Sequence, residues 1–79
     1  MKLKKLCKVI SVEEPILIRA CNTDGEVIKE FDFESIPVSD MDKVLNSRVT
    51  SVYSVFDKEY FFKVHDEFQR TYTVIEVEY

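Results

Sequence analysis

With 79 residues, 46% of them hydrophobic and 13% aromatic, the chain has room for a single domain, residues 1–79, and is too apolar to be intrinsically disordered. No apolar run approaches the ~20 residues of a membrane-spanning helix, and the lysine-rich start lacks the apolar stretch of a signal peptide. A net charge of −4 argues against general binding to nucleic acid. We therefore expect a cytoplasmic protein, with Cys7 and Cys21 as reduced thiols.

The first part of the sequence predicts three strands, over residues 2–12, 16–21 and 26–34. Val9 and Ile10 favour extended backbone in the first of them, and Pro15 marks the turn that follows. The strongest local pattern is Asn22-Thr23-Asp24-Gly25. Asn and Asp tolerate turn conformations, and Gly supplies a positive φ, so residues 22–25 predict a tight hairpin turn.

Side chains alternate along the third predicted strand. Phe31 and Phe33 fall on one face with Val27 and Lys29, so we expect the two rings to point into the core. The opposite face carries Glu26, Ile28, Glu30, Asp32 and Glu34. The sequence therefore predicts a stripe of carboxylates on the solvent side of this strand.

A short helix is predicted over residues 39–46. Ser39 suits the N-cap position, and the acidic residues that follow it suit the positive end of the helix dipole. Met41, Val44 and Leu45 are three and four residues apart, so they share one face of the helix.

Three further strands are predicted over residues 48–56, 59–65 and 70–79. In the last of them, Thr73, Ile75, Val77 and Tyr79 share one face. The order is then βββ-α-βββ, an α+β fold with a mostly antiparallel sheet, because the connections are short. The sheet is expected to be open with the helix on one face, or else to form a small, partly closed barrel. An open sheet exposes edge strands, which favours a homodimer.

The candidate binding residues are acidic side chains with one aromatic residue added: Asp24, Glu26, Glu30, Asp32, Glu34, Asp40, Asp42 and Phe61. Alternate strand residues lie about 6.6–6.8 Å apart, close to the spacing of neighbouring phosphates, so the acids could imitate a nucleic acid. The alternative is a solvated face that keeps the domain soluble. Phe61 is included because residues 56–72 hold more aromatic rings than one core face accommodates.

No catalytic, metal or cofactor site is predicted. His65 is the only histidine, and neither a nucleophile motif nor a glycine-rich loop accompanies it. The calcium-loop pattern that residues 22–26 partly match is incomplete. Lys2, Lys4, Lys5 and Lys8 lack interleaved aromatic residues, so they are a weak indication of nucleic-acid binding.

In size, charge and lack of an active site, the chain resembles the small acidic inhibitors that phages encode, although no specific motif carries the resemblance. The sequence thus predicts a non-enzymatic, protein-binding module that blocks a nucleic-acid-handling enzyme by steric occlusion or by nucleic-acid mimicry, with no direct binding to nucleic acid or membrane. The alternative is a structural protein that forms a homo-oligomer through an edge strand or an aromatic surface.

Overall fold

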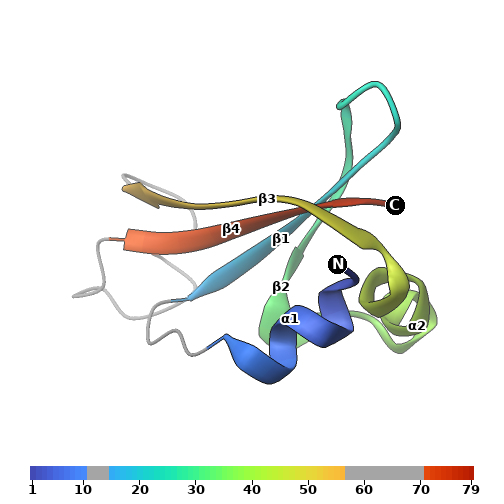
Figure 1. Cartoon of the computed structure of the whole chain (residues 1–79), viewed down its shortest axis with the longest axis horizontal. Coiled ribbons are helices and arrows are strands. Elements are labelled where there is room, and N and C mark those ends of the chain that lie inside the picture. The colour runs from blue at the N-terminus through green and yellow to red at the C-terminus, as the bar shows by residue number, and fades with distance from the viewer. Residues whose placement is uncertain (11–14, 57–70) are drawn as a thin grey trace.

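A mixed, four-stranded sheet with two α-helices on one of its faces makes up the part of the chain described by the computed structural model, residues 1–10, 15–56 and 71–79 (Figure 1). The helices are α1 (Leu3–Val9) and α2 (Val38–Asn46), and a 3-10 turn spans Phe33–Ser35. The strands are β1 (Ile16–Cys21), β2 (Val27–Asp32), β3 (Arg48–Phe56) and β4 (Thr71–Glu78).

The strand order β2-β1-β4-β3 differs from two successive meanders. The pairs β1–β2 and β3–β4 are antiparallel, whereas β1 and β4 are parallel. The α+β class is confirmed, but the predicted order and the single helix match only in part. The predicted strand over 59–65 lies outside the described residues.

The N-terminal segment is helix α1, so the prediction of a strand over residues 2–12 is wrong. Leu3, Leu6, Cys7 and Ile10 stand at positions i, i+3, i+4 and i+7, the spacing of one face of an amphipathic helix, and all four contact the core. The lysines of this segment point outward, with Lys4, Lys5 and Lys8 all exposed. Lys8 also lies in the last turn, where the helix dipole favours a positive charge.

The tight turn between β1 and β2 is confirmed. Gly25 adopts a φ of 86°, and Asn22 Oδ1 accepts hydrogen bonds from the amides of Asp24 at 3.0 Å and Glu26 at 2.9 Å. An irregularity in the β1–β2 pairing sets Cys21 opposite Val27 and Ala20 opposite Lys29. The predicted alternation is therefore broken near the turn.

Strand β2 ends at Asp32, two residues before the predicted end. Phe31 is buried, as predicted, at 8% exposure. Phe33 begins the 3-10 turn and packs against the edge of the core. Because the chain leaves the strand here, Glu34 is no longer in line with Glu30 and Asp32.

Helix α2 begins at Val38, one residue before the predicted start, with Pro37 at the N-cap. Ser39 therefore lies inside the helix and is not its cap. The predicted apolar face is confirmed, since Val44 is fully buried while Met41 and Leu45 pack around it. Both helices thus cover the same side of the sheet.

The core fills the space between the helices and the sheet. Its fully buried members are Leu3, Ile18, Ala20, Val44 and Val77. In β4, the predicted face with Ile75, Val77 and Tyr79 is the one that contacts this core. The face that points away from the helices is called the open face below. Because side chains alternate along a strand, the residues between those that face the core point to the open face, and Arg19 and Glu76 are among them.

Candidate functional site

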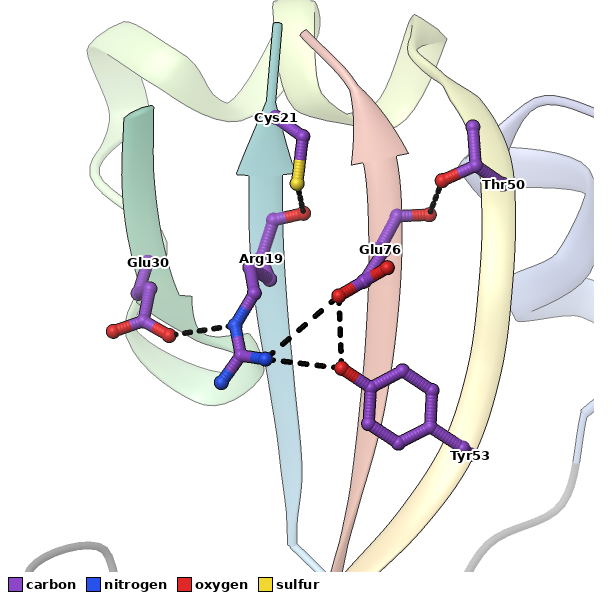
Figure 2. Close-up of polar contacts among 6 residues, drawn as sticks. All are labelled: Arg19, Cys21, Glu30, Thr50, Tyr53 and Glu76. Carbon is purple, nitrogen blue, oxygen red and sulfur yellow. Dashed lines mark hydrogen bonds and ion pairs between the residues drawn. The ribbon is translucent and has the colours of Figure 1, made fainter. Parts of the chain in front are cut away.

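A polar network on the open face joins one side chain from each of the four strands (Figure 2). Its members, here called the polar network, are Arg19 of β1, Glu30 of β2, Tyr53 of β3 and Glu76 of β4. Arg19 lies directly opposite Glu30 on one side and Glu76 on the other. The strand pairing therefore fixes a guanidinium between two carboxylates.

Short hydrogen bonds connect the members of the polar network. Arg19 Nε donates to Glu30 Oε2 at 2.8 Å, and Arg19 Nη1 donates to the Tyr53 hydroxyl at 2.9 Å. That hydroxyl donates to Glu76 Oε2 at 2.8 Å, which also lies 3.7 Å from Arg19 Nη1. The network holds one positive and two negative charges, so it is a polar patch with a net charge of −1.

The ionisation of the polar network follows from these contacts. Burial by itself lowers the pKa of Arg19, but the hydrogen bond to Glu30 and the surrounding negative groups outweigh it, so the pKa is raised. Burial and the hydrogen bond to Glu76 raise the pKa of Tyr53. At neutral pH the guanidinium stays charged and the phenol stays protonated, so neither group is prepared for proton transfer.

A shallow cavity of about 260 Å³ lies beside the network, between the hairpin turn, the start of β3 and the end of β4. Its lining includes Cys21, Arg48, Thr50 and Glu78. Burial raises the pKa of Cys21, so its thiol is not the reactive thiolate. Arg48 is held by Glu78 at 2.8 Å. The cavity thus presents paired charges and a protonated thiol.

The second feature is a stretch in which every residue is exposed, residues 23–30, here called the exposed hairpin. It comprises most of the β1–β2 turn and the first part of β2, and it projects beyond the rest of the sheet (Figure 1). Val27 and Ile28 are each 50% exposed. Asp24, Glu26 and Glu30 stand around them, against a single lysine, Lys29. Apolar side chains rimmed by charge are typical of a protein-binding surface.

The predicted acidic residues do not form one continuous patch. Asp24 and Glu26 belong to the exposed hairpin, and Glu30 is neutralised by Arg19. Asp40 lies on the helix side, where it accepts hydrogen bonds from the Tyr79 hydroxyl at 2.8 Å and from Lys29 Nζ at 3.4 Å.

The remaining predicted residues lie further along the chain. Asp42 is on α2, where its Oδ1 accepts a hydrogen bond from Asn46 at 3.3 Å. Asp32 Oδ1 accepts from the amide of Glu34 at 3.1 Å and so caps the 3-10 turn. Phe61 lies outside the described residues.

The central position of Arg19, Tyr53 and Glu76 was not predicted from the sequence. A usable indication was present, because Arg19 is the only charged residue of β1 and Glu76 interrupts the apolar run of residues 74–77 in β4 with a charge of opposite sign. Their meeting depends on the parallel pairing of β1 with β4, which no local pattern predicts.

Within residues 1–10, 15–56 and 71–79, no cluster of three or more His, Cys, Asp or Glu side chains is arranged to hold a metal ion. No helix in the same residues is long and apolar enough to cross a membrane. No protein family, curated protein or solved structure shows a significant match to the chain.

Proposed function

We propose that this chain is a non-catalytic, protein-binding module that holds its partner along the exposed hairpin. The observation that carries the proposal is the unbroken exposure of residues 23–30 in a hairpin that projects from the sheet (Figure 1). Its second strand, β2, ends the strand order of the described residues. A projecting hairpin reaches into a concave surface of a partner more easily than a flat sheet face does.

Strand β2 suits a partner that adds an extended segment to the sheet. It is the outermost strand next to β1 in the described residues, and Val27 and Ile28 are half-exposed along it. In this mode of binding, the main chain supplies hydrogen bonds and the side chains supply specificity. Two apolar side chains at the start of β2 would anchor such a segment.

The charge of the exposed hairpin favours a basic partner. Asp24 and Glu26 make no ion pair among the described residues, and Lys29 is already paired with Asp40. Enzymes that handle nucleic acid present a basic groove to the phosphates. We propose that the partner is an enzyme of this class. Since Glu30 is neutralised and Glu34 leaves the strand, the arrangement supports steric occlusion better than mimicry of a phosphate row.

A second copy of the chain is a poor partner for β2. Suppose that two copies pair antiparallel through their β2 strands, related by a twofold axis perpendicular to the joined sheet. The helices of both copies then lie on the same face of that sheet, and one residue of β2 lies directly opposite the same residue of the second copy. The registers that pair most of Val27–Asp32 set Lys29 opposite Lys29, or Glu30 opposite Glu30. Like charges directly opposite each other destabilise a strand pair, so this edge favours a different protein.

The test is capture of a partner from the native cell lysate, followed by measurement of its affinity for purified variants. We expect the double change Asp24→Lys with Glu26→Lys to abolish the binding that the unmodified chain shows. Both side chains are exposed, so the fold is retained. Raising the salt concentration should also release the partner, because contacts between exposed charges are screened.

The matched control is Glu34→Lys with Asp42→Lys, which changes the net charge equally but lies outside the exposed hairpin. This variant should bind as the unmodified chain does. The proposal is wrong if both double variants lose binding equally, since net charge would then be the cause, or if neither loses it.

A further inference from the structure

The outward side of helix α1 is a basic surface, here called the lysine face, formed by Lys4, Lys5 and Lys8 with Val9 beside them. All four side chains are exposed, and Val9 is 72% exposed. Lys4 and Lys8 are four positions apart, as are Lys5 and Val9, so these side chains are neighbours on the helix surface. The lysine face thus combines three positive charges with an exposed apolar residue.

The rest of the chain does not neutralise the lysine face. The ion pairs within the described residues use Arg19, Lys29 and Arg48, and none of them involves a lysine of α1. The first turn of α1 contains no acidic residue, although the helix dipole favours one there. Like charges three or four positions apart also destabilise a helix. An anionic partner on the lysine face would offset both effects.

The exposed hairpin has the complementary composition. Asp24 and Glu26 make no ion pair among the described residues. Val27 and Ile28 follow them directly, and each is 50% exposed. A contact between the exposed hairpin and the lysine face would pair opposite charges and remove apolar surface from water on both sides.

The two surfaces are separated within one chain. Figure 1 shows the exposed hairpin projecting from one end of the sheet, whereas α1 packs on the helix side of the sheet, away from the turn. No ion pair among the described residues joins them. A contact between these two surfaces therefore needs a second copy of the chain.

We infer that two copies of the chain form a twofold dimer in which the exposed hairpin of each copy lies on the lysine face of the other. In a twofold dimer the same pair of surfaces meets twice. Once the first contact has formed, the second is intramolecular, so two weak contacts reinforce each other. A head-to-tail chain of copies would leave one hairpin and one lysine face unpaired at its ends.

Side chains form this contact, so it differs from strand pairing through β2. Lysine carries its three donors on a flexible stem, so the ammonium groups can reach the carboxylates of Asp24 and Glu26 without one exact backbone geometry. Val9 then packs against Val27 or Ile28 of the second copy. The charged side chains surround this apolar contact, as in other protein interfaces.

The inference uses the exposed hairpin but does not rest on the partner proposed above. The dimer and that partner would take the same two carboxylates, Asp24 and Glu26. Dimerisation and partner binding should therefore exclude each other. The free protein is then a dimer, and the partner binds a single chain.

The test is the solution mass of the full chain, measured by sedimentation and light scattering from about 1 µM to about 1 mM. In about 0.1 M salt we expect the mass to rise toward twice that of one chain, and about 1 M salt should return it to one chain by screening the charges. Lys5→Glu with Lys8→Glu should keep the mass at one chain, and so should Asp24→Lys with Glu26→Lys. All four side chains are exposed, so both variants should fold, which circular dichroism checks.

Net charge gives the opposite expectation, which separates it from surface pairing. Each replacement changes the charge by two, so the hairpin variant has a net charge of 0 and the lysine variant −8, against −4 for the unmodified chain. If repulsion between whole chains governed association, the hairpin variant would associate most strongly. The matched control, Glu34→Lys with Asp42→Lys, also has a net charge of 0 and should still dimerise.

An equal mixture of the hairpin variant and the lysine variant is the decisive measurement. Each offers the other a surface of opposite charge, so the mixture should form a dimer although neither variant does alone. The lysine variant should also still bind the partner captured from the lysate, so a failure of the dimer is distinguishable from a failure of the proposed function. A monomer at all concentrations, a dimer that survives either double change, or a mixture that stays monomeric overturns the inference.

Discussion

Arg19 and Arg48 each hold a glutamate at 2.8 Å on the same face of the sheet, yet their surroundings differ. The Arg19 side chain is 25% exposed and has three partners, whereas the Arg48 side chain is 65% exposed and has one. An exposed ion pair contributes little to stability, since water and salt screen it. A shielded guanidinium that satisfies several groups contributes more, because its loss leaves those groups unpaired.

We predict that Arg19→Met lowers the free energy of unfolding by about 1–2 kcal/mol, whereas Arg48→Met lowers it by less than about 1 kcal/mol. Both changes keep most of the aliphatic stem, so the difference reports the polar contacts. Urea denaturation at pH 7 measures the two values. Equal losses would show that the polar network adds nothing beyond an ordinary surface ion pair.

Asp40 joins helix α2 to the end of the sheet through Tyr79. The hydrogen bond from the Tyr79 hydroxyl lowers the pKa of Asp40, and Lys29 adds to the effect. The same bond raises the pKa of Tyr79. The Lys43 ammonium lies 4.0 Å from the centre of the Tyr79 ring, so the ring is held from a second direction.

The contribution of this bond should depend on pH. A lowered pKa in the folded state stabilises the fold above the ordinary Asp value near 4, and the gain is lost as pH falls through the folded pKa. For Tyr79 the raised pKa stabilises the fold below about pH 10, and the gain is lost above it. Tyr79→Phe should therefore destabilise the protein at pH 7 and approach the unmodified chain at both extremes. Unfolding curves across the pH range measure this, and a constant difference would contradict it.

At the scale of elements, helix α1 shows how β-branched residues conceal a helical period. Val9 and Ile10 favour a strand by propensity, but Leu3, Leu6 and Ile10 repeat with the spacing of one helix face. Packing decides between the two, because the helical segment buries Leu3 fully and places Leu6 and Ile10 against the core. Tertiary contact thus overrides local preference here.

Leu3→Ala should lower the free energy of unfolding by about 2–5 kcal/mol, the range for removing a buried leucine. Lys4→Ala, on the exposed side of the same turn, should change it by no more than about 0.5 kcal/mol. Thermal and urea unfolding followed by circular dichroism provide both values. An effect at Lys4 as large as that at Leu3 would contradict the helical assignment, because this helix buries the side chain of Leu3 and exposes that of Lys4.

At the scale of the whole molecule, β2 and β3 stand at the two ends of the strand order in the described residues, with β1 and β4 between them. The polar network nevertheless links the two sides, since Arg19 donates to Glu30 of the exposed hairpin and to Tyr53 of β3. Substitutions in direct contact with Arg19 are therefore expected to be coupled.

Several parts of the fold could be predicted from sequence because short-range interactions decide them. The turn at residues 22–25 depends on Asn22 and Gly25, and the apolar face of α2 depends on residues three and four positions apart. Strands β1 and β3 carry β-branched residues over the predicted ranges. The acidic residues near the hairpin were also identifiable, because charge is a property of the sequence.

Only the tertiary structure decided how these parts combine. The parallel pairing of β1 with β4 joins residues far apart along the chain, and it alone brings Arg19 to Glu76. That pairing, together with the packing of the helices on one face of the sheet, determines which acidic residues form ion pairs and which stay exposed. The sequence by itself determined charge and, where neighbouring residues decide it, local backbone shape, as in the turn at residues 22–25. The tertiary structure decided exposure, pairing and the helical form of α1, because these depend on which distant segments share the core.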